Sequence, residues 1–484
     1  MKRIITCFLY VIPVLSLAQT PMDSIAVLES YFDLSYSAAE RDSLFEGLRA
    51  NQGRIELIHA VGIENHVPPA MVFMPAPFHE SEEQLEINWN LPGSVEMPER
   101  REDLAFLSVA QLSVLLREQK ISSVELTQFF LDRLYHYNDT LKCVVSFLED
   151  RAIKKAKEAD QEIAEGKYRG PLHGIPYGLK DLFAVEGTVT SWGAMAYKDQ
   201  VIEETATVVK KLDEAGAVLI AKLTLGALAM GDVWYGGVTK NPWNLSQGSS
   251  GSSAGSASAV SAGLVPFAIG TETLGSIVSP STRCGVTGLR PTFGRVSRFG
   301  GMALSWSMDK VGPIARSAKD CALVFDVIRG TDGKDPSLID DAFNYGKDVR
   351  DLKVAYLQED FARSRNIVND SLAIKKLREL GIELHAITIP DELPIYPLTV
   401  ILASEAAAAF DQLTRSGRDS LLVRQDKGAW PNYFRTARFI PAVEYVNASR
   451  IRTELIAQFN ELIEPYDVII APSFGTQLVL TNLT

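Results

Sequence analysis

Two stretches of the chain decide the fold. The first, Gly174–Phe183, reads GIPYGLKDLF and places a lysine among glycine, proline and apolar residues. The second, Gly248–Ser279, reads GSSGSSAGSASAVSAGLVPFAIGTETLGSIVS and contains Ser252 and Ser276 among small residues that permit unusual backbone angles. One lysine and two serines are sufficient for nucleophilic catalysis without histidine.

Lys180 is the candidate general base. A serine hydroxyl is a weak nucleophile until a base takes its proton, and a lysine can be that base only when it is neutral. Burial lowers the pKa of a lysine, and the apolar neighbours of Lys180 favour burial. The influence of the adjacent Asp181 stays open, because neighbours in sequence often point apart.

The two serines lie in different local settings. Ser276 follows a turn that ends in Gly275, and such a turn can aim several backbone N–H groups at one oxyanion. Ser252 lies in a Gly/Ser run of the kind that usually forms a flexible linker. This run leads directly into the apolar stretch 259–269, which favours a small-residue helix followed by a buried strand. The phosphate-loop pattern GxxxxGK[ST] does not occur in it.

The order of the motifs carries a family resemblance. LHGIPYGLKD and NPWNLSQGSSG come first, followed by GSSAGSASAVSAG, TETLGSIVSPS, CGVTGLRPTFGRVSR, SWSMDKVGPIARS and finally YDVIIAPSFGT. From about Asp103 to its end, the chain resembles the amidase signature family. The resemblance implies an α/β fold with one large mixed, twisted β-sheet flanked by α-helices.

The resemblance also implies the site residues. The nucleophile falls on Ser276, the serine that the family holds through a cis peptide bond falls on Ser252, and the catalytic lysine falls on Lys180. The implied relay passes a proton from Ser276 to Ser252 to Lys180, and it needs no metal or organic cofactor. The implied oxyanion donors are the backbone N–H groups of Thr273, Leu274, Gly275 and Ser276.

Two positions depart from the family pattern. Leu274 replaces a glycine. Its side chain could narrow the oxyanion turn or form part of the wall of the acyl pocket. Val278 stands where some members carry an arginine that binds or orders a charged substrate. Arg283 could supply a charge nearby.

The ends of the chain indicate three parts. Residues 1–18 start with Lys2-Arg3 and continue as a short apolar run, which predicts a signal peptide and export to the periplasm or medium, with an uncleaved anchor as the alternative. No stable membrane insertion is expected after its removal. Residues 19–100 form an extension, helical over Asp23 to Leu48 and then rich in proline. Residues 101–484 form the catalytic domain, which is expected to lack the family's usual C-terminal end.

Local patterns support an α/β domain. Ser108 and Ser122 each begin a capping box, and strands are expected at 217–221, 352–357, 382–389 and 467–471. Cys143, Cys284 and Cys321 are expected to be small buried hydrophobes, with one disulfide possible after export. The histidines form no metal-ligand pair and are expected to be structural: His59, His66, His79, His136, His173 and His385.

The net charge and the motifs together favour an enzyme over a nucleic-acid-binding protein. The net charge of −12 and the lack of a basic cluster argue against a nucleic-acid partner. The leading hypothesis is an exported serine amidase acting on a small-molecule amide, with a homodimer possible. The alternatives are a non-catalytic binding or scaffold protein on the same fold, and the glutaminase subunit of a tRNA-dependent amidotransferase. The expected signal peptide and the acidic charge disfavour the glutaminase subunit.

Overall fold

The chain divides into two compact units, residues 1–63 and 64–484. The computed structural model describes residues 21–32, 83–344, 348–364, 367–390 and 395–472, and individual residues between 34 and 73. In the first unit, helix α1 (Pro21–Tyr31) overlaps the stretch predicted to be helical. The predicted signal peptide and the expected C-terminal shortening both lie outside the described residues.

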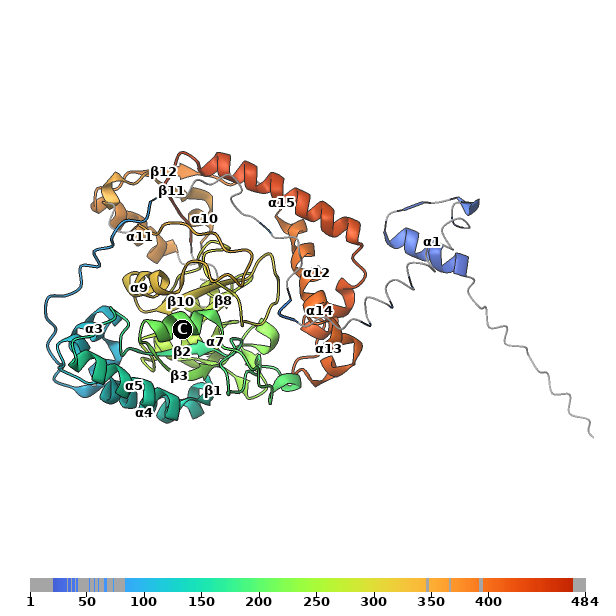
Figure 1. Cartoon of the computed structure of the whole chain (residues 1–484). Helices are drawn as coiled ribbons and strands as arrows, with labels where there is room; N and C mark the ends of the chain where they lie inside the picture. Colours follow the sequence, from blue (N-terminus) through green and yellow to red (C-terminus); the bar gives the residue numbers. More distant parts are fainter. Residues whose placement is uncertain are drawn as a thin grey trace, which may run out of the picture. The chain divides into compact units, whose positions relative to one another are not determined.

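The second unit is built around a six-stranded mixed sheet in the order β1-β3-β2-β8-β10-β9 (Figure 1). The central strand β2 runs parallel to both β3 and β8, while the outer pairs are antiparallel. All residues of β2 and β3 are buried, so both faces of the sheet are covered. The strands are β1 (Val144–Phe147), β2 (Pro176–Lys180), β3 (Val218–Leu223), β8 (Phe267–Glu272), β9 (Thr287–Gly288) and β10 (Lys310–Ala315).

Helices pack against this sheet, which confirms the predicted fold class. Helices α4, α5 and α7 contact β3, and α9 contacts β10. Both predicted capping boxes are present, at the starts of α3 and α4. The helices of this region are α3 (Val109–Arg117), α4 (Ser123–Leu141), α5 (Glu149–Ala164), α6 (Thr207–Glu214), α7 (Ala254–Ser261), α8 (Val278–Cys284) and α9 (Ala318–Ile328).

Three of the predicted strands form a second sheet of their own. β11 (Val354–Leu357) lies between β12 (Leu384–Ile387) and β13 (Val468–Ile470), and both neighbours run parallel to it. Parallel neighbours need long crossovers, and helices supply them here. These helices are α10 (Gln358–Arg363), α11 (Ile367–Glu379), α12 (Thr399–Ala409), α13 (Asp411–Arg415), α14 (Trp430–Ala437) and α15 (Ala442–Ile463). Of the four predicted strands, only the one at 217–221 joins the central sheet.

Two short hairpins lead from β3 toward α7. They pair β4 (Val233–Trp234) with β5 (Gly237–Val238), and β6 (Lys240–Asn241) with β7 (Asn244–Gly248). None of the described helices has the length and apolar character needed to span a membrane.

The Gly/Ser run forms a tightly packed helix rather than a linker. Gly255, in the first turn of α7, donates its N–H to Thr224 O at 2.9 Å. A Cβ added at Gly255 would lie 2.4 Å from both Cys143 O and Thr224 N, a distance that no side chain tolerates. Small residues are therefore needed here so that α7 can approach the ends of β1 and β3. This result confirms the predicted small-residue helix and the buried strand β8 that follows it.

The three cysteines of the catalytic region are buried and free, as predicted for small hydrophobes. Burial raises the pKa of the Cys143 and Cys321 thiols to about 12. They therefore stay protonated and inert near neutral pH.

Two fully buried lysines lie on neighbouring strands. Lys222 on β3 pairs in register with Leu179 on β2, so Lys222 and Lys180 project to opposite faces of the sheet. Lys222 Nζ lies 2.9 Å from Asp181 Oδ1, and Asp181 also accepts a hydrogen bond from Ser191 N at 2.9 Å. Asp181 therefore neutralises Lys222 and makes no ion pair with Lys180, which settles the point that the sequence left open.

We expect the Lys222→Met substitution to lower the free energy of unfolding by about 3–5 kcal/mol, because it leaves the Asp181 carboxylate buried without its cation. Urea denaturation monitored by circular dichroism measures this loss. Lys167→Met is the matched control, because Lys167 pairs with Glu165 on the exposed surface and its loss should barely move the unfolding midpoint. Unchanged stability of the Lys222 variant would contradict this account of the buried pair.

Candidate active site

Lys180 is held entirely by hydroxyl and carbonyl oxygens. Its Nζ lies 2.8 Å from Ser252 Oγ, 3.0 Å from Ser253 Oγ, 2.9 Å from Thr271 Oγ1 and 3.3 Å from Thr271 O. The side chain is 0% exposed. Within the described part of the chain, it forms no ion pair.

The proton directions around Lys180 can be worked out from its neighbours. Ser253 Oγ donates to Thr271 O at 3.0 Å and accepts from Thr271 N at 3.2 Å. Its only proton is therefore used, so Ser253 must accept from Lys180. A neutral amine has two N–H donors and one lone pair. In the structure, Lys180 Nζ donates to Ser252 Oγ, Ser253 Oγ and Thr271 Oγ1. Once the amine is neutral, its lone pair can accept the proton of the Ser252 hydroxyl.

The electrostatics favour this neutral form. Burial lowers the pKa of Lys180 to about 7, with more distant Asp309 and Glu272 opposing the shift. An amine with this pKa is substantially neutral at physiological pH, so the predicted base has the protonation state that it needs.

The two predicted serines approach one another through the backbone. The peptide bond between Gly251 and Ser252 is cis, as the resemblance implied. Ser253 N donates to Ser276 O at 3.0 Å, which fixes the Ser276 segment against the Ser252 segment. Within the described residues, no hydrogen bond joins Ser252 Oγ to Ser276 Oγ. The structure thus assembles the Lys180–Ser252 half of the predicted triad and places Ser276 next to it.

The turn before Ser276 is clamped at its first residue. Thr273 Oγ1 donates to Asp309 Oδ1 at 2.5 Å, and Lys310 Nζ donates to Thr273 O at 3.1 Å. Burial raises the pKa of Asp309 and lowers that of Lys310 to about 8. Gly275 has a φ of +84°, a left-handed conformation that glycine adopts without strain.

The far side of the same turn is held by Glu272. Its Oε2 accepts from Ile277 N at 2.8 Å and from Val278 N at 3.0 Å. These backbone hydrogen bonds outweigh burial and lower the pKa of Glu272, so it stays ionised. The N–H groups of Leu274 and Ser276 donate to no protein acceptor in the described structure. The turn is therefore rigid, and it leaves these N–H groups available to a ligand.

The residues that depart from the family pattern have clear positions. The side chain of Leu274 is 65% exposed, so it points away from the turn and does not narrow it. It is not among the residues that line the cavity beside the lysine, so it does not form a wall of that cavity. Val278 contributes its backbone N–H to Glu272. Arg283 has two buried nitrogens, Nε and Nη1, without an acceptor among the described residues. Burial lowers the pKa of Arg283, and nearby Asp232 opposes that shift.

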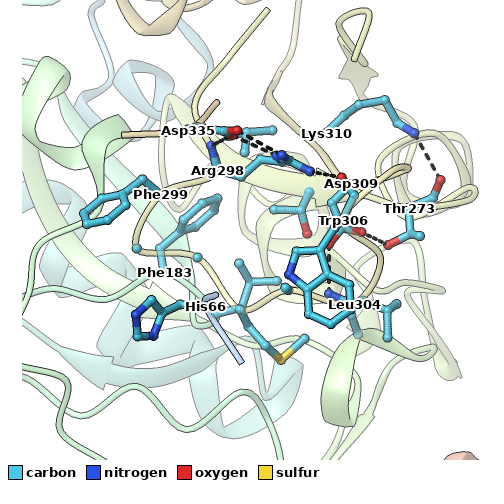
Figure 2. A pocket seen from close by; sticks show the side chains of 18 of the residues that line it. His66, Phe183, Thr273, Arg298, Phe299, Leu304, Trp306, Asp309, Lys310 and Asp335 are labelled. Carbon is cyan, nitrogen blue, oxygen red and sulfur yellow. Dashed lines mark hydrogen bonds and ion pairs between the residues drawn. The ribbon is translucent and has the colours of Figure 1, made fainter. Parts of the chain in front are cut away.

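A cavity of about 70 Å³ lies beside this site. Thr271 and Thr273 line it, so it adjoins both the lysine and the oxyanion turn. Figure 2 shows His66 and Phe183 on one side of it, and Asp309 and Thr273 on the other. Further lining residues are Leu182, Arg298, Met302, Leu304 and Trp306. Arg298 is neutralised by Asp335, whose Oδ2 lies 2.8 Å from Arg298 Nε.

The sequence reasoning missed several residues of this site. Ser253 and Thr271 hold Lys180, and Asp309 and Lys310 hold the turn. All four lie inside motifs that carry the family resemblance, which is the signal that could have found them. His66 lies outside every motif, and the sequence predicts only a structural role for it.

No group of three or more His, Cys, Asp or Glu residues in the described structure could hold a metal ion.

Comparisons with known proteins identify the family of this chain. A family model described as Amidase matches residues 125–482. A glutamyl-tRNA(Gln) amidotransferase subunit of Coxiella burnetii is 36% identical over 407 residues, covering 78% of this chain and 84% of that protein. Native peptide amidase from Stenotrophomonas maltophilia is 28% identical with a TM-score of 0.63, covering 74% of this chain and 81% of that one.

A third relative has the same fold. The amidase family protein from Bacillus anthracis is 26% identical with a TM-score of 0.67, covering 79% of this chain and 83% of that one. The matched residues include Lys180, Ser252 and Ser276. The chain therefore belongs to the amidase signature family, whose enzymes act on carbon–nitrogen bonds.

Proposed function

We propose that this protein is an exported serine amidase that hydrolyses a small amide, an amino-acid amide or a peptide amide. The observation that carries the proposal is the fully buried Lys180, whose Nζ lies 2.8 Å from Ser252 Oγ and whose pKa is lowered by burial to about 7. The basic and apolar start of residues 1–18 supports the export part of the proposal.

The proposed reaction has two halves. Neutral Lys180 takes the proton of Ser252, Ser252 takes the proton of Ser276, and Ser276 Oγ attacks the amide carbonyl carbon. The returning proton reaches the leaving nitrogen as the C–N bond breaks, which leaves an ester on Ser276. Water then attacks this ester by the same relay and releases the acid.

The missing Ser252–Ser276 hydrogen bond is compatible with this relay, since such contacts often tighten only when substrate is bound. The oxyanion of each tetrahedral intermediate would lie against backbone N–H groups of Thr273, Leu274, Gly275 and Ser276. Two of these, from Leu274 and Ser276, have no protein acceptor in the described structure. Preorganised donors of this kind each contribute about 10²–10³ in rate.

The cavity beside Thr271 and Thr273 is the proposed acyl subsite. Its walls are mostly apolar, and Trp306 Nε1 is buried there without an acceptor among the described residues. A buried N–H donor without a partner is costly, so a ligand with a hydrogen-bond acceptor would complete it.

A second candidate function is a glutaminase subunit that works beside partner subunits. The similarity to the Coxiella burnetii amidotransferase subunit favours it. Amide hydrolysis by the chain alone, without a partner, separates the two candidates. A scaffold without catalysis is the third possibility, and labelling of Ser276 by a serine-directed fluorophosphonate would exclude it.

We expect Lys180→Ala, Ser252→Ala and Ser276→Ala each to lower kcat on the best amide of a panel by about 10⁴-fold or more, because members of a proton relay act as a unit. Hydrolysis is measured as release of the amine. Ser246→Ala is the control, since Ser246 is exposed and its hydroxyl donates to the nearby Asn244 side chain. Undiminished hydrolysis by folded Ser276→Ala would eliminate this mechanism.

The pKa of Lys180 predicts a pH profile. Below about pH 7 the lysine is protonated, so kcat/KM should fall tenfold for each further unit of acid, whereas above it the rate should level off. An uncharged amide assayed from pH 5 to 9 gives this curve, and unfolding curves over the same range check that the enzyme stays folded. A flat profile, or a rise that continues to pH 9, would show that the base is not a buried lysine.

A further inference from the structure

A short piece of the N-terminal extension is bonded to the rim of the cavity. Asn65 Nδ2 donates to Ala303 O at 2.9 Å and to Ala409 O at 3.2 Å, and Ala303 N donates to Asn65 Oδ1 at 2.8 Å. The Asn65 amide thus satisfies both backbone groups of Ala303, which itself lines the cavity. This pairing fixes the position of the next residue, His66.

His66 is one of the cavity's walls. Figure 2 shows it on the same side as Phe183 and opposite Asp309. Thr271 and Thr273, which adjoin the lysine and the oxyanion turn, belong to the same cavity. The imidazole therefore lies across the cavity from Thr273, where the oxyanion turn begins.

A second contact ties the extension to the catalytic domain. The Phe73 ring packs edge-on against Phe293, with ring centroids 5.4 Å apart. The Arg452 guanidinium lies over the same ring, 4.0 Å from its centroid. Burial lowers the pKa of Arg452, and nearby Glu405 and Tyr445 oppose that shift. Asn65 and Phe73 are thus two separate anchors for the extension.

We propose that Asn65 anchors His66 as the end wall of the acyl subsite, so that the extension selects amides of short acyl groups. This inference rests on the proposed amidase function. The cavity is small, at about 70 Å³, and His66 is one of its lining residues. Longer chains would have to displace His66, and with it the hydrogen bonds that Asn65 makes to Ala303.

The first test compares kcat/KM across unbranched acyl anilides from acetyl to decanoyl. In the parent enzyme, kcat/KM should rise to about butyryl or pentanoyl and then fall. His66→Ala should raise the octanoyl-to-butyryl ratio by about tenfold or more, because each buried methylene contributes about fourfold. His66→Trp should move the optimum to shorter chains. His136→Ala is the control, since His136 is exposed on α4 and should leave the ratio unchanged.

The outcomes separate the two proposals. Hydrolysis of short amides with a chain-length ratio that neither His66 variant changes would overturn the end-wall assignment and leave the amidase proposal standing. If the parent enzyme hydrolyses no amide, both the amidase proposal and the end-wall assignment would be overturned.

The anchor has a test that does not depend on activity. Hydrogen exchange of the Ala303 amide should be slow in the parent and at least tenfold faster in Asn65→Ala, because Asn65 Oδ1 is the acceptor of that N–H. Equal exchange in the two proteins would show that the extension is not bonded to the rim, and would overturn the proposal.

Discussion

The structure depends on the burial of a lysine without a counter-ion. Lys180 lies at the end of the central strand, fully buried, with oxygens of Ser252, Ser253 and Thr271 around its Nζ. Burying a full positive charge is costly, and uncharged oxygens compensate for it only in part. The neutral amine is therefore strongly populated near pH 7, and a neutral amine is what a general base requires. The strand order that buries this residue thus also sets its chemistry.

Lys222 shows how specific this environment is. It is equally buried on the adjacent strand, yet Asp181 lies 2.9 Å from it. Asp181 follows Lys180 directly in sequence, just past the end of β2, and its carboxylate reaches Lys222 on the other face of the sheet. Lys222 therefore forms an ion pair with Asp181 on one face of the sheet, whereas Lys180 on the opposite face forms no ion pair among the described residues. A carboxylate on the Lys180 side would hold that lysine protonated and remove its function as a base.

The sequence was sufficient for the features that arise locally. The capping boxes at Ser108 and Ser122, the small-residue helix after Ser252 and the cis bond at Gly251–Ser252 all follow from contiguous residues or motif matches. Partners far apart in the chain were not predicted. Thr271 is 91 residues from Lys180, and Asn65 is 238 residues from Ala303. Such pairs depend on sheet order and on the path of the extension, which single-sequence patterns do not fix. For the same reason, the strands near 355, 385 and 469 were found, but their separate sheet was not.

The oxyanion turn shows how the sheet positions a site that lies outside it. Thr273 follows the end of β8. It is bonded to Lys310, the first residue of the neighbouring antiparallel strand β10, and to Asp309, which precedes that strand. Glu272, the last residue of β8, binds the backbone beyond Ser276 from the other side. These hydrogen bonds are made to Thr273 and to the backbone, and none of them involves the side chain of Leu274, which points into solvent. A leucine is therefore tolerated where the family has glycine, and the geometry of the turn does not depend on it.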